Sequence, residues 1–523
     1  MSDKAIVNII NFIRGVEPRY PSLDLVATLE KEIHLVQSHG LPATWLLQFD
    51  ALIDPRFVAM MRTLDDQQEI GLWFEVVQPQ VERAGLKWRG RPGFSWDWHA
   101  HVGFSVGYTP RERELLADVA MSEFKAVFGR YPSSVGSWFM DAHLIGYLHD
   151  RYGVLASCNC RDQWGTDGYS MWGGYYSQAY YPSRKNAFVP AQNKAAQIPV
   201  PIFRMLGSDP IYQYDAPVGA NGQLVITLEP SCELGGGSPE WVRWFFDTMM
   251  NSPSLTFGYA QTGQENSFGW EAMQKGLTYQ VSLLAELSRV GRLNVETLES
   301  SARRYRSMYD VTPASAVTGR SDWKGEGRSS VWYSSRFYRI NMFWEDGKFR
   351  VRDIRLFDEE YSERYLESVC TSDSSMYDTL PVMDGVLWSD NDTTAAIRIV
   401  EISQDGNTQE PTGGRPLVSE VGETLLIEWH TDSGRAIKSM CSPNKWTISV
   451  DDGEPWLLEM SWADSITVPI KLVETHELSY EHESFPYKLR CISGEFRQID
   501  DSIRIHPGDD GKIILGFQDF QST

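Results

Sequence analysis

Strand-like and helix-like stretches alternate from residue 5 to about residue 290, and this alternation constrains the fold more than any other feature. The apolar run at residues 5–13 is typical of a buried parallel strand, and a helical pattern follows it until Gly40. Further strands are predicted at residues 43–49, 69–76, 134–141, 154–157, 199–206, 224–228 and 255–259. Helices are predicted at residues 57–64, 110–128, 144–152, 240–250, 268–287 and 295–309. Such strand–helix repeats favour a parallel α/β barrel.

The pattern changes after Pro313. Short runs at residues 331–333, 338–340 and 349–351 are typical of antiparallel strands separated by turns. A chain of 523 residues is also too long for one ordinary core. We therefore predict two domains: a (β/α) barrel with a helical end segment over residues 1–313, and a mostly antiparallel, sandwich-like β domain over residues 314–523.

The chain is strongly acidic, with a formal net charge of −22. This charge disfavours nucleic acid and anionic membranes as partners and favours a neutral or cationic ligand. No apolar run approaches the length of a membrane span, and the N-terminus lacks the basic region of a signal peptide, so a cytoplasmic protein is expected. The six cysteines show neither a disulfide framework nor zinc spacing, and we expect no metal or other cofactor.

Charged and polar residues stand where the predicted strands end. Asp141 is the clearest case, because it closes an apolar run and is followed directly by a helical pattern. In a barrel these strand ends meet at one mouth, where chemistry takes place. The strand-end residues are Arg14, Gln48, Asp50, Glu75, Asp141, Arg161, Asp162, Asp209, Glu229 and Glu265. Two facing carboxylates suit glycoside hydrolysis, since one protonates the leaving oxygen and the other attacks the sugar or activates water.

Tryptophan and tyrosine are dense in the long irregular segments at residues 79–108 and 158–197. Their rings combine an apolar face with a polar group, which suits stacking on sugars. We therefore expect an oligosaccharide or glycoside as the substrate. The side chains expected to bind it are Trp73, Glu75, Trp96, Asp97, His99, His101, Trp138, Asp162, Trp164, Trp172 and Asp209.

Three short motifs resemble the glycoside hydrolase/deacetylase superfamily, whose fold is an irregular (β/α)7 barrel. They are Ala-Thr-Trp-Leu at residues 43–46, Gln-Glu-Ile-Gly at 68–71 and Gly-Ser-Trp-Phe at 136–139, and the resemblance covers roughly residues 5–310. Within the superfamily the pattern is most similar to glycoside hydrolase family 57. That resemblance implies Asp141 as the nucleophile and Glu229 as the general acid, with Glu265 as the reserve candidate for the acid.

The positions at which this chain differs from the superfamily's motifs help to choose among three hypotheses for its function. NodB-type deacetylases carry an Asp-Asp pair after the first strand and a His-x-x-x-His metal motif after Glu-Ile-Gly, whereas this chain has Arg14 and no histidine at residues 71–78. A metal-free glycosidase is therefore preferred. A metal-dependent carbohydrate deacetylase with an atypical site at Asp97, His99 and His101 is the first alternative, and a non-catalytic carbohydrate-binding protein is the second.

Overall fold

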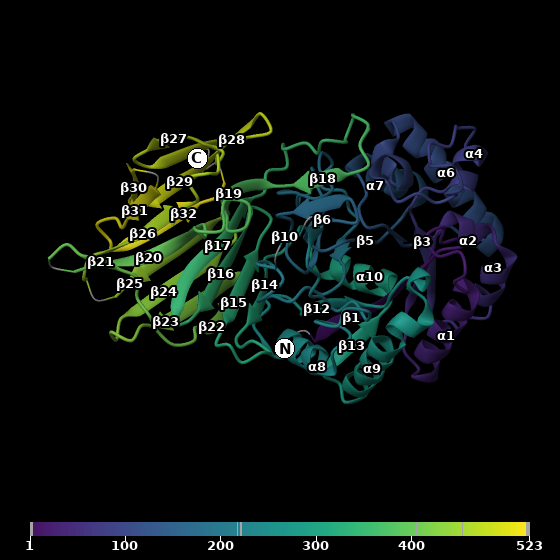
Figure 1. The fold of residues 1–523 in the computed structure, drawn as a ribbon, viewed down its shortest axis with the longest axis horizontal. Helices are drawn as coiled ribbons and strands as arrows, with labels where there is room; N and C mark the ends of the chain where they lie inside the picture. Colours follow the sequence, from purple (N-terminus) through teal and green to yellow (C-terminus); the bar gives the residue numbers. More distant parts are fainter. Residues whose placement is uncertain are drawn as a thin grey trace.

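The computed structural model describes residues 4–216, 218–219, 222–403, 405–451, 453–500 and 502–518. It is a mixed α/β structure in which a curved parallel sheet with surrounding helices is followed by large antiparallel sheets. Figure 1 shows the helices and short parallel strands on one side of the molecule and the antiparallel sheets on the other. No helix in the described ranges is long and apolar enough to cross a membrane.

The parallel sheet is built around the first strand, β1 (Ala5–Ile13), all of whose residues are buried. Its strand order is β12-β1-β2-β3-β4, and β13 also pairs with β1. A bridge between Ser134 and Ala156 leads on to β5, which pairs in parallel with β9, and β8 runs antiparallel to β9. The bounds are β2 (Thr44–Leu47), β3 (Glu69–Trp73), β4 (Val135–Gly136), β5 (Ser157–Asn159), β8 (Ala179–Tyr180), β9 (Ile202–Arg204), β12 (Tyr259–Thr262) and β13 (Leu293–Glu296).

This sheet forms part of a barrel. In the described residues no strand ladder joins β9 to β12, so the closed (β/α)7 arrangement expected from the sequence is not seen. The predicted strand at 224–228 contributes a single bridge, at Thr227, because the Leu228 N–H turns back to the carbonyls of Leu206 and Gly207. The helix predicted from residue 295 begins later, after β13, where the Thr297 side chain caps it by accepting from Ser300 N–H.

The helices around the sheet begin and end at recognisable capping residues. The helix at residues 110–128 opens with a capping box between Thr109 and Glu112 and ends at Gly129 in the left-handed conformation, which favours glycine. The helices are α1 (Leu25–Ser38), α2 (Phe49–Ile53), α3 (Pro55–Met61), α4 (Gln78–Arg83), α5 (Ala100–Gly103), α6 (Pro110–Phe128), α7 (Ala142–Tyr152), α8 (Pro239–Asn251), α9 (Trp270–Arg289) and α10 (Leu298–Met308), with 3-10 turns η1 (Ser105–Gly107) and η2 (Asn266–Phe268).

Two large antiparallel sheets make up the later part of the chain, as its alternating runs predicted. They lie face to face, because the rings of Phe349 and Trp429 from different sheets are 5.9 Å apart and Ser439 Oγ lies 3.4 Å from Met342 Sδ. The 10-stranded sheet contains β14 (Ser315–Gly319), β15 (Ser329–Ser334), β16 (Tyr338–Glu345), β17 (Lys348–Leu356), β19 (Leu380–Asp384), β20 (Ala396–Ile402), β21 (Thr408–Gln409), β26 (Trp456–Ser461), β30 (Glu495–Ile499) and β31 (Ser502–His506). The 8-stranded sheet contains β22 (Leu417–Val421), β23 (Thr424–His430), β24 (Ala436–Ser442), β25 (Lys445–Val450), β27 (Ile470–Glu474), β28 (Glu477–His482), β29 (Phe485–Ser493) and β32 (Lys512–Gly516).

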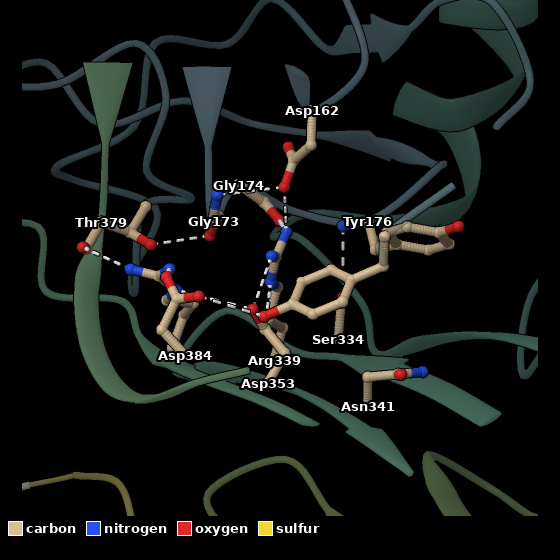
Figure 2. A network of polar contacts seen from close by, with 12 residues as sticks. Asp162, Gly173, Gly174, Tyr176, Ser334, Arg339, Asn341, Asp353, Thr379 and Asp384 are labelled. Carbon is tan, nitrogen blue, oxygen red and sulfur yellow. Dashed lines mark hydrogen bonds and ion pairs between the residues drawn. The ribbon is translucent and has the colours of Figure 1, made fainter. Parts of the chain in front are cut away.

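The two parts of the chain are joined by hydrogen-bonded strands and by buried charges. In the hairpin of β6 (Gln163–Thr166) and β7 (Tyr169–Trp172), β7 pairs in parallel with β18 (Ser375–Asp378). The short pair β10 (Val218–Gly219) and β11 (Gly222–Gln223) lies next to β6. Arg339 of β16 reaches across to Asp162 while it also pairs with Asp353 at 2.7 Å (Figure 2). Because unpaired buried charges are costly, this network favours one fixed arrangement of the two parts.

Candidate active-site pocket

A pocket opens at the carboxyl ends of β1, β3 and β12. It occupies about 710 Å³, a volume that includes space open to solvent. Arg14 follows β1, Glu75 lies two residues beyond β3, and Glu265 lies three residues beyond β12, so the parallel topology brings the three together. The lining residues are Arg14, Arg19, Glu75, Trp96, Trp98, Phe104, Trp138, Cys160, Arg161, Gln163, Thr166, Asp167, Tyr169, Leu206, Val225, Glu229, Gln264, Glu265 and Phe268.

Arg14 binds two of the pocket carboxylates at once. Its Nη2 lies 2.8 Å from Glu265 Oε2 and 3.1 Å from Glu75 Oε2, and its guanidinium stacks over the Trp96 ring at 3.6 Å. All these side chains are buried. A buried cation between two buried carboxylates compensates charges that would otherwise be strongly unfavourable.

Glu75 lies on the inner side of this cluster and titrates unusually. Its Oε2 accepts a hydrogen bond from Gln48 Nε2 at 3.2 Å. Burial raises the pKa of Glu75 to about 7, with Arg14 opposing the rise and the charge of Glu265 adding to it. A carboxyl group with such a pKa can hold or release a proton near neutral pH.

Glu229 occupies a second environment in the same pocket. Ser231 Oγ and Gln264 Nε2 donate to its Oε1 at 3.0 and 3.1 Å. Burial raises the pKa of Glu229, and the charge of Glu265 contributes to the rise, whereas Arg161 opposes it. Gln264 also links the two acids, because its Oε1 accepts the backbone N–H of Glu265 at 2.9 Å. The environment of Glu229 therefore favours a proton more than that of an exposed carboxyl group does, whereas Glu265 is ion-paired to Arg14.

Aromatic rings form much of the remaining wall. Trp96, Trp98 and Trp138 all line the pocket; the sequence analysis expected Trp96 and Trp138, but not Trp98, to bind the sugar. Trp73 lies behind them, fully buried, with its ring 5.4 Å from that of Trp138. Flat apolar faces beside carboxylates suit the apolar faces and hydroxyl groups of a sugar ring.

Asp141, the predicted nucleophile, does not line this pocket. It caps α7 by accepting the N–H of Leu144 at 2.9 Å, pairs with Arg113 at 3.0 Å and accepts from Ser105 Oγ at 2.5 Å. Asp141 and Arg113 are both fully enclosed. The geometry gives Asp141 a capping and charge-balancing position, away from the space a substrate would occupy.

The residues of the predicted atypical metal site have other partners. Asp97 pairs with Arg91 at 2.8 Å and accepts the His99 N–H, and His101 Nδ1 lies 2.9 Å from the carbonyl oxygen of Ser372. Among the residues that the structure describes, no three His, Cys, Asp or Glu side chains are grouped to hold a metal ion. Asp97, His99 and His101 therefore do not form the converging ligand set that the deacetylase hypothesis requires.

The other predicted binding residues support the fold around the pocket. Asp162 accepts from Arg339 and the Gly173 N–H (Figure 2) and also from Arg204, and Trp172 donates to Asp384 at 2.8 Å. Trp164 packs against Trp172 with ring centroids 6.1 Å apart. Asp209 accepts two backbone N–H groups and the Trp241 indole. None of these four is a lining residue of the pocket.

Several lining residues had no predicted role in binding. The sequence could have indicated Gln264 as a pocket residue, because it stands beside Glu265 just after an apolar strand. No sequence pattern indicated Arg19 or Tyr169, since Arg19 reaches the pocket from a loop and Tyr169 from the β6–β7 hairpin.

The chain was also compared with known proteins. No family model matches it, and no curated protein matches its sequence. A solved structure described provisionally as a glycoside hydrolase/deacetylase from Parabacteroides distasonis is similar at a TM-score of 0.49 and 14% identity, over 72% of this chain and 90% of the other. A provisionally described polysaccharide deacetylase from Mycobacterium smegmatis gives a TM-score of 0.38 and 11% identity, over 59% and 92%. A GH57 branching enzyme from Thermococcus kodakaraensis gives 0.28 and 11%, over 58% and 71%. These likenesses are too distant to assign a chemistry, which has to come from the pocket.

Proposed function

We propose that this chain is a carbohydrate-active hydrolase, and more specifically a glycosidase that uses Glu229 and Glu265. The observation that carries the proposal is the presence of two carboxyl groups in one tryptophan-lined pocket in different environments: burial raises the pKa of Glu229, whereas Glu265 is ion-paired to Arg14. Glycoside hydrolysis needs such a pair, because one group must donate a proton while the other acts as a charged base or nucleophile.

The environments assign the roles. Glu229 is the general acid, since burial raises the pKa of its carboxyl group and so favours the form that can give a proton to the leaving oxygen. Glu265 is the charged partner, since Arg14 contacts its Oε2 through both Nε and Nη2, at 3.1 and 2.8 Å. Glu75 shares Arg14 and acts as a positioning residue, because removing it would change the charge balance around Glu265. Asp141 has no catalytic role in this proposal.

The test distinguishes the general acid from its charged partner by how the rate of hydrolysis in each variant depends on the leaving group of the substrate. Glu229→Gln should slow hydrolysis of alkyl glycosides by about 10²–10⁴-fold, yet slow dinitrophenyl glycosides much less, because that leaving group needs no proton. Glu265→Gln should slow both classes similarly. Glu123→Gln, which changes a carboxylate on the outer face of α6, serves as the matched control.

Two results would contradict the proposal. One is wild-type-like turnover in both Glu229→Gln and Glu265→Gln. The other is a folded wild-type protein that hydrolyses no member of a broad panel of α- and β-glycosides, which would instead favour the non-catalytic binding protein.

A further inference from the structure

One cation that lines the pocket lies near carboxyl groups without forming an ion pair with any of them in the described residues. Arg161 is 4% exposed and lines the pocket, but it forms no ion pair in the described part of the chain. Its Nη1 donates only to the backbone carbonyl of Asp162, and its buried Nε has no hydrogen-bond partner. An unmatched guanidinium at such depth is costly unless something else binds it.

The nearest acidic side chain in the sequence cannot supply that partner. The Asp162 carboxylate accepts from Arg339 and from the Gly173 N–H (Figure 2), and it also pairs with Arg204 at 2.6 Å. The two positive charges of these arginines already exceed the single negative charge of the carboxylate, so Asp162 does not balance Arg161 as well. Arg161 is therefore left facing the pocket.

The other pocket charges are also accounted for. Arg14 is matched by Glu75 and Glu265, and Arg19 pairs with Glu17 at 2.7 Å. Glu229 lies near Arg161 but outside ion-pair distance, and burial raises the pKa of its carboxyl group. Asp167, in the turn between β6 and β7, also lines the pocket; burial raises its pKa and the charge of nearby Arg161 opposes the rise, but the two form no ion pair in the described residues.

We propose that the sugar bound in this pocket carries an anionic group, either the carboxylate of a uronic acid or a sulfate ester, and that Arg161 binds it. The inference rests on the proposed function only in placing a sugar in the pocket. Guanidinium pairs with such oxygens through charge-assisted, often bidentate hydrogen bonds. The net charge of −22 predicts a neutral or cationic ligand, but it acts at long range, where salt screens it, whereas Arg161 acts by contact.

The experiment compares acidic sugars with their neutral parents. Dissociation constants are measured by tryptophan fluorescence for glucuronate and glucose, galacturonate and galactose, and glucose 6-sulfate. In the wild-type protein at least one acidic sugar should bind about tenfold or more tightly than its parent, the range for one charge-assisted hydrogen bond. The uronates and the sulfate distinguish the two sources of the anion.

Variants then locate the effect. Arg161→Met should remove the advantage of the acidic sugar and leave binding of the neutral parent within about twofold. Arg161→Lys keeps the positive charge but loses the bidentate hydrogen-bonding geometry of the guanidinium, so it should lower the advantage of the acidic sugar several-fold. If the methionine variant fails to fold, the lysine variant provides the test. Arg184→Gln, at an exposed ion pair with Asp150, is the control and should preserve the advantage.

The proposal is overturned if no acidic sugar binds better than its parent, or if the advantage survives in Arg161→Met and Arg161→Lys. Its failure is distinguishable from failure of the glycosidase assignment. Hydrolysis of neutral glycosides that depends on Glu229, without any preference for acidic sugars, would refute the role of Arg161 alone. Binding of uronate that depends on Arg161, without any hydrolysis, would refute the glycosidase alone.

Discussion

Replacing Asp141 by asparagine tests whether this residue supports the fold or performs chemistry. In the structure Asp141 caps α7 and pairs with Arg113 in a fully enclosed site. Asparagine is as good an N-cap as aspartate, so the variant keeps the hydrogen bond to Leu144 N–H. What it loses is the charge opposite Arg113.

The size of the effect follows from those contacts. Removing one partner of a buried ion pair costs about 3–5 kcal/mol of unfolding free energy, because the other charge stays buried. Glu363 reduces this cost. Burial raises the pKa of Glu363 to about 8, and the charge of Asp141 adds to the rise, so neutralising Asp141 lowers that pKa and lets Glu363 balance Arg113. We expect a net loss of about 2–4 kcal/mol at pH 7.

The assay measures stability and turnover on the same samples. Urea unfolding followed by tryptophan fluorescence should show the lower stability of Asp141→Asn, and Asp141→Ala should lose about 1 kcal/mol more because it also lacks the cap. Turnover per folded molecule should stay within a few-fold of the wild type. A variant of unchanged stability with turnover reduced by 10⁴-fold or so, the loss expected for a nucleophile, would refute this reasoning and restore the role implied by the resemblance to family 57.

Three further predictions concern the pocket and the junction with the β sheets. Glu75→Gln should weaken the loss of stability between pH 5 and pH 8, measured by calorimetry, because the folded wild type keeps this proton up to a pKa of about 7 while the unfolded chain releases it near 4.5. An unchanged pH dependence would contradict the raised pKa. Arg339→Met should cost about 2–4 kcal/mol in urea unfolding, since it removes the cation shared by the carboxylates of Asp162 and Asp353 and leaves them only Arg204 and Arg355; a cost below about 1 kcal/mol would refute the importance of that network. Trp98→Ala should raise the dissociation constant for the bound sugar about fivefold without changing stability by more than about 1 kcal/mol, and unaltered affinity would show that this ring does not stack on the sugar.

The sequence predicted the individual strands and helices of this fold better than the way in which the strands close into a barrel. The strand at 5–13 and the helix at 110–128 are confirmed at nearly the expected bounds, because an uninterrupted apolar run and a Thr-Pro start with a capping box are local signals. The run at 224–228 looks equally apolar, yet its backbone bonds to a loop. Whether a short apolar run pairs as a strand depends on neighbours that are distant in the sequence, and this also decides whether a barrel closes.

The sequence indicated that the pocket would be built from residues at strand ends. Position alone could not tell which acidic residues at strand ends line the pocket and which stabilise the fold. The side-chain type separates them. The four strand-end aspartates all accept backbone N–H groups: from Gly15 and Ala51 for Asp50, from Leu144 for Asp141, from Gly173 for Asp162, and from Ile211 and Tyr212 for Asp209.

The three strand-end glutamates behave differently. In the described residues no backbone N–H donates to the carboxylates of Glu75, Glu229 or Glu265, and all three line the pocket. The physical reason is reach: the short aspartate side chain folds back onto the next turn of backbone, which makes it a favoured N-cap, whereas glutamate extends past it. Glu265 even stands at the N-cap position of η2 without capping it. Extending Asp141 to glutamate should therefore weaken the cap of α7, and shortening Glu265 to aspartate should withdraw the carboxylate from Arg14 and reduce turnover while the protein stays folded.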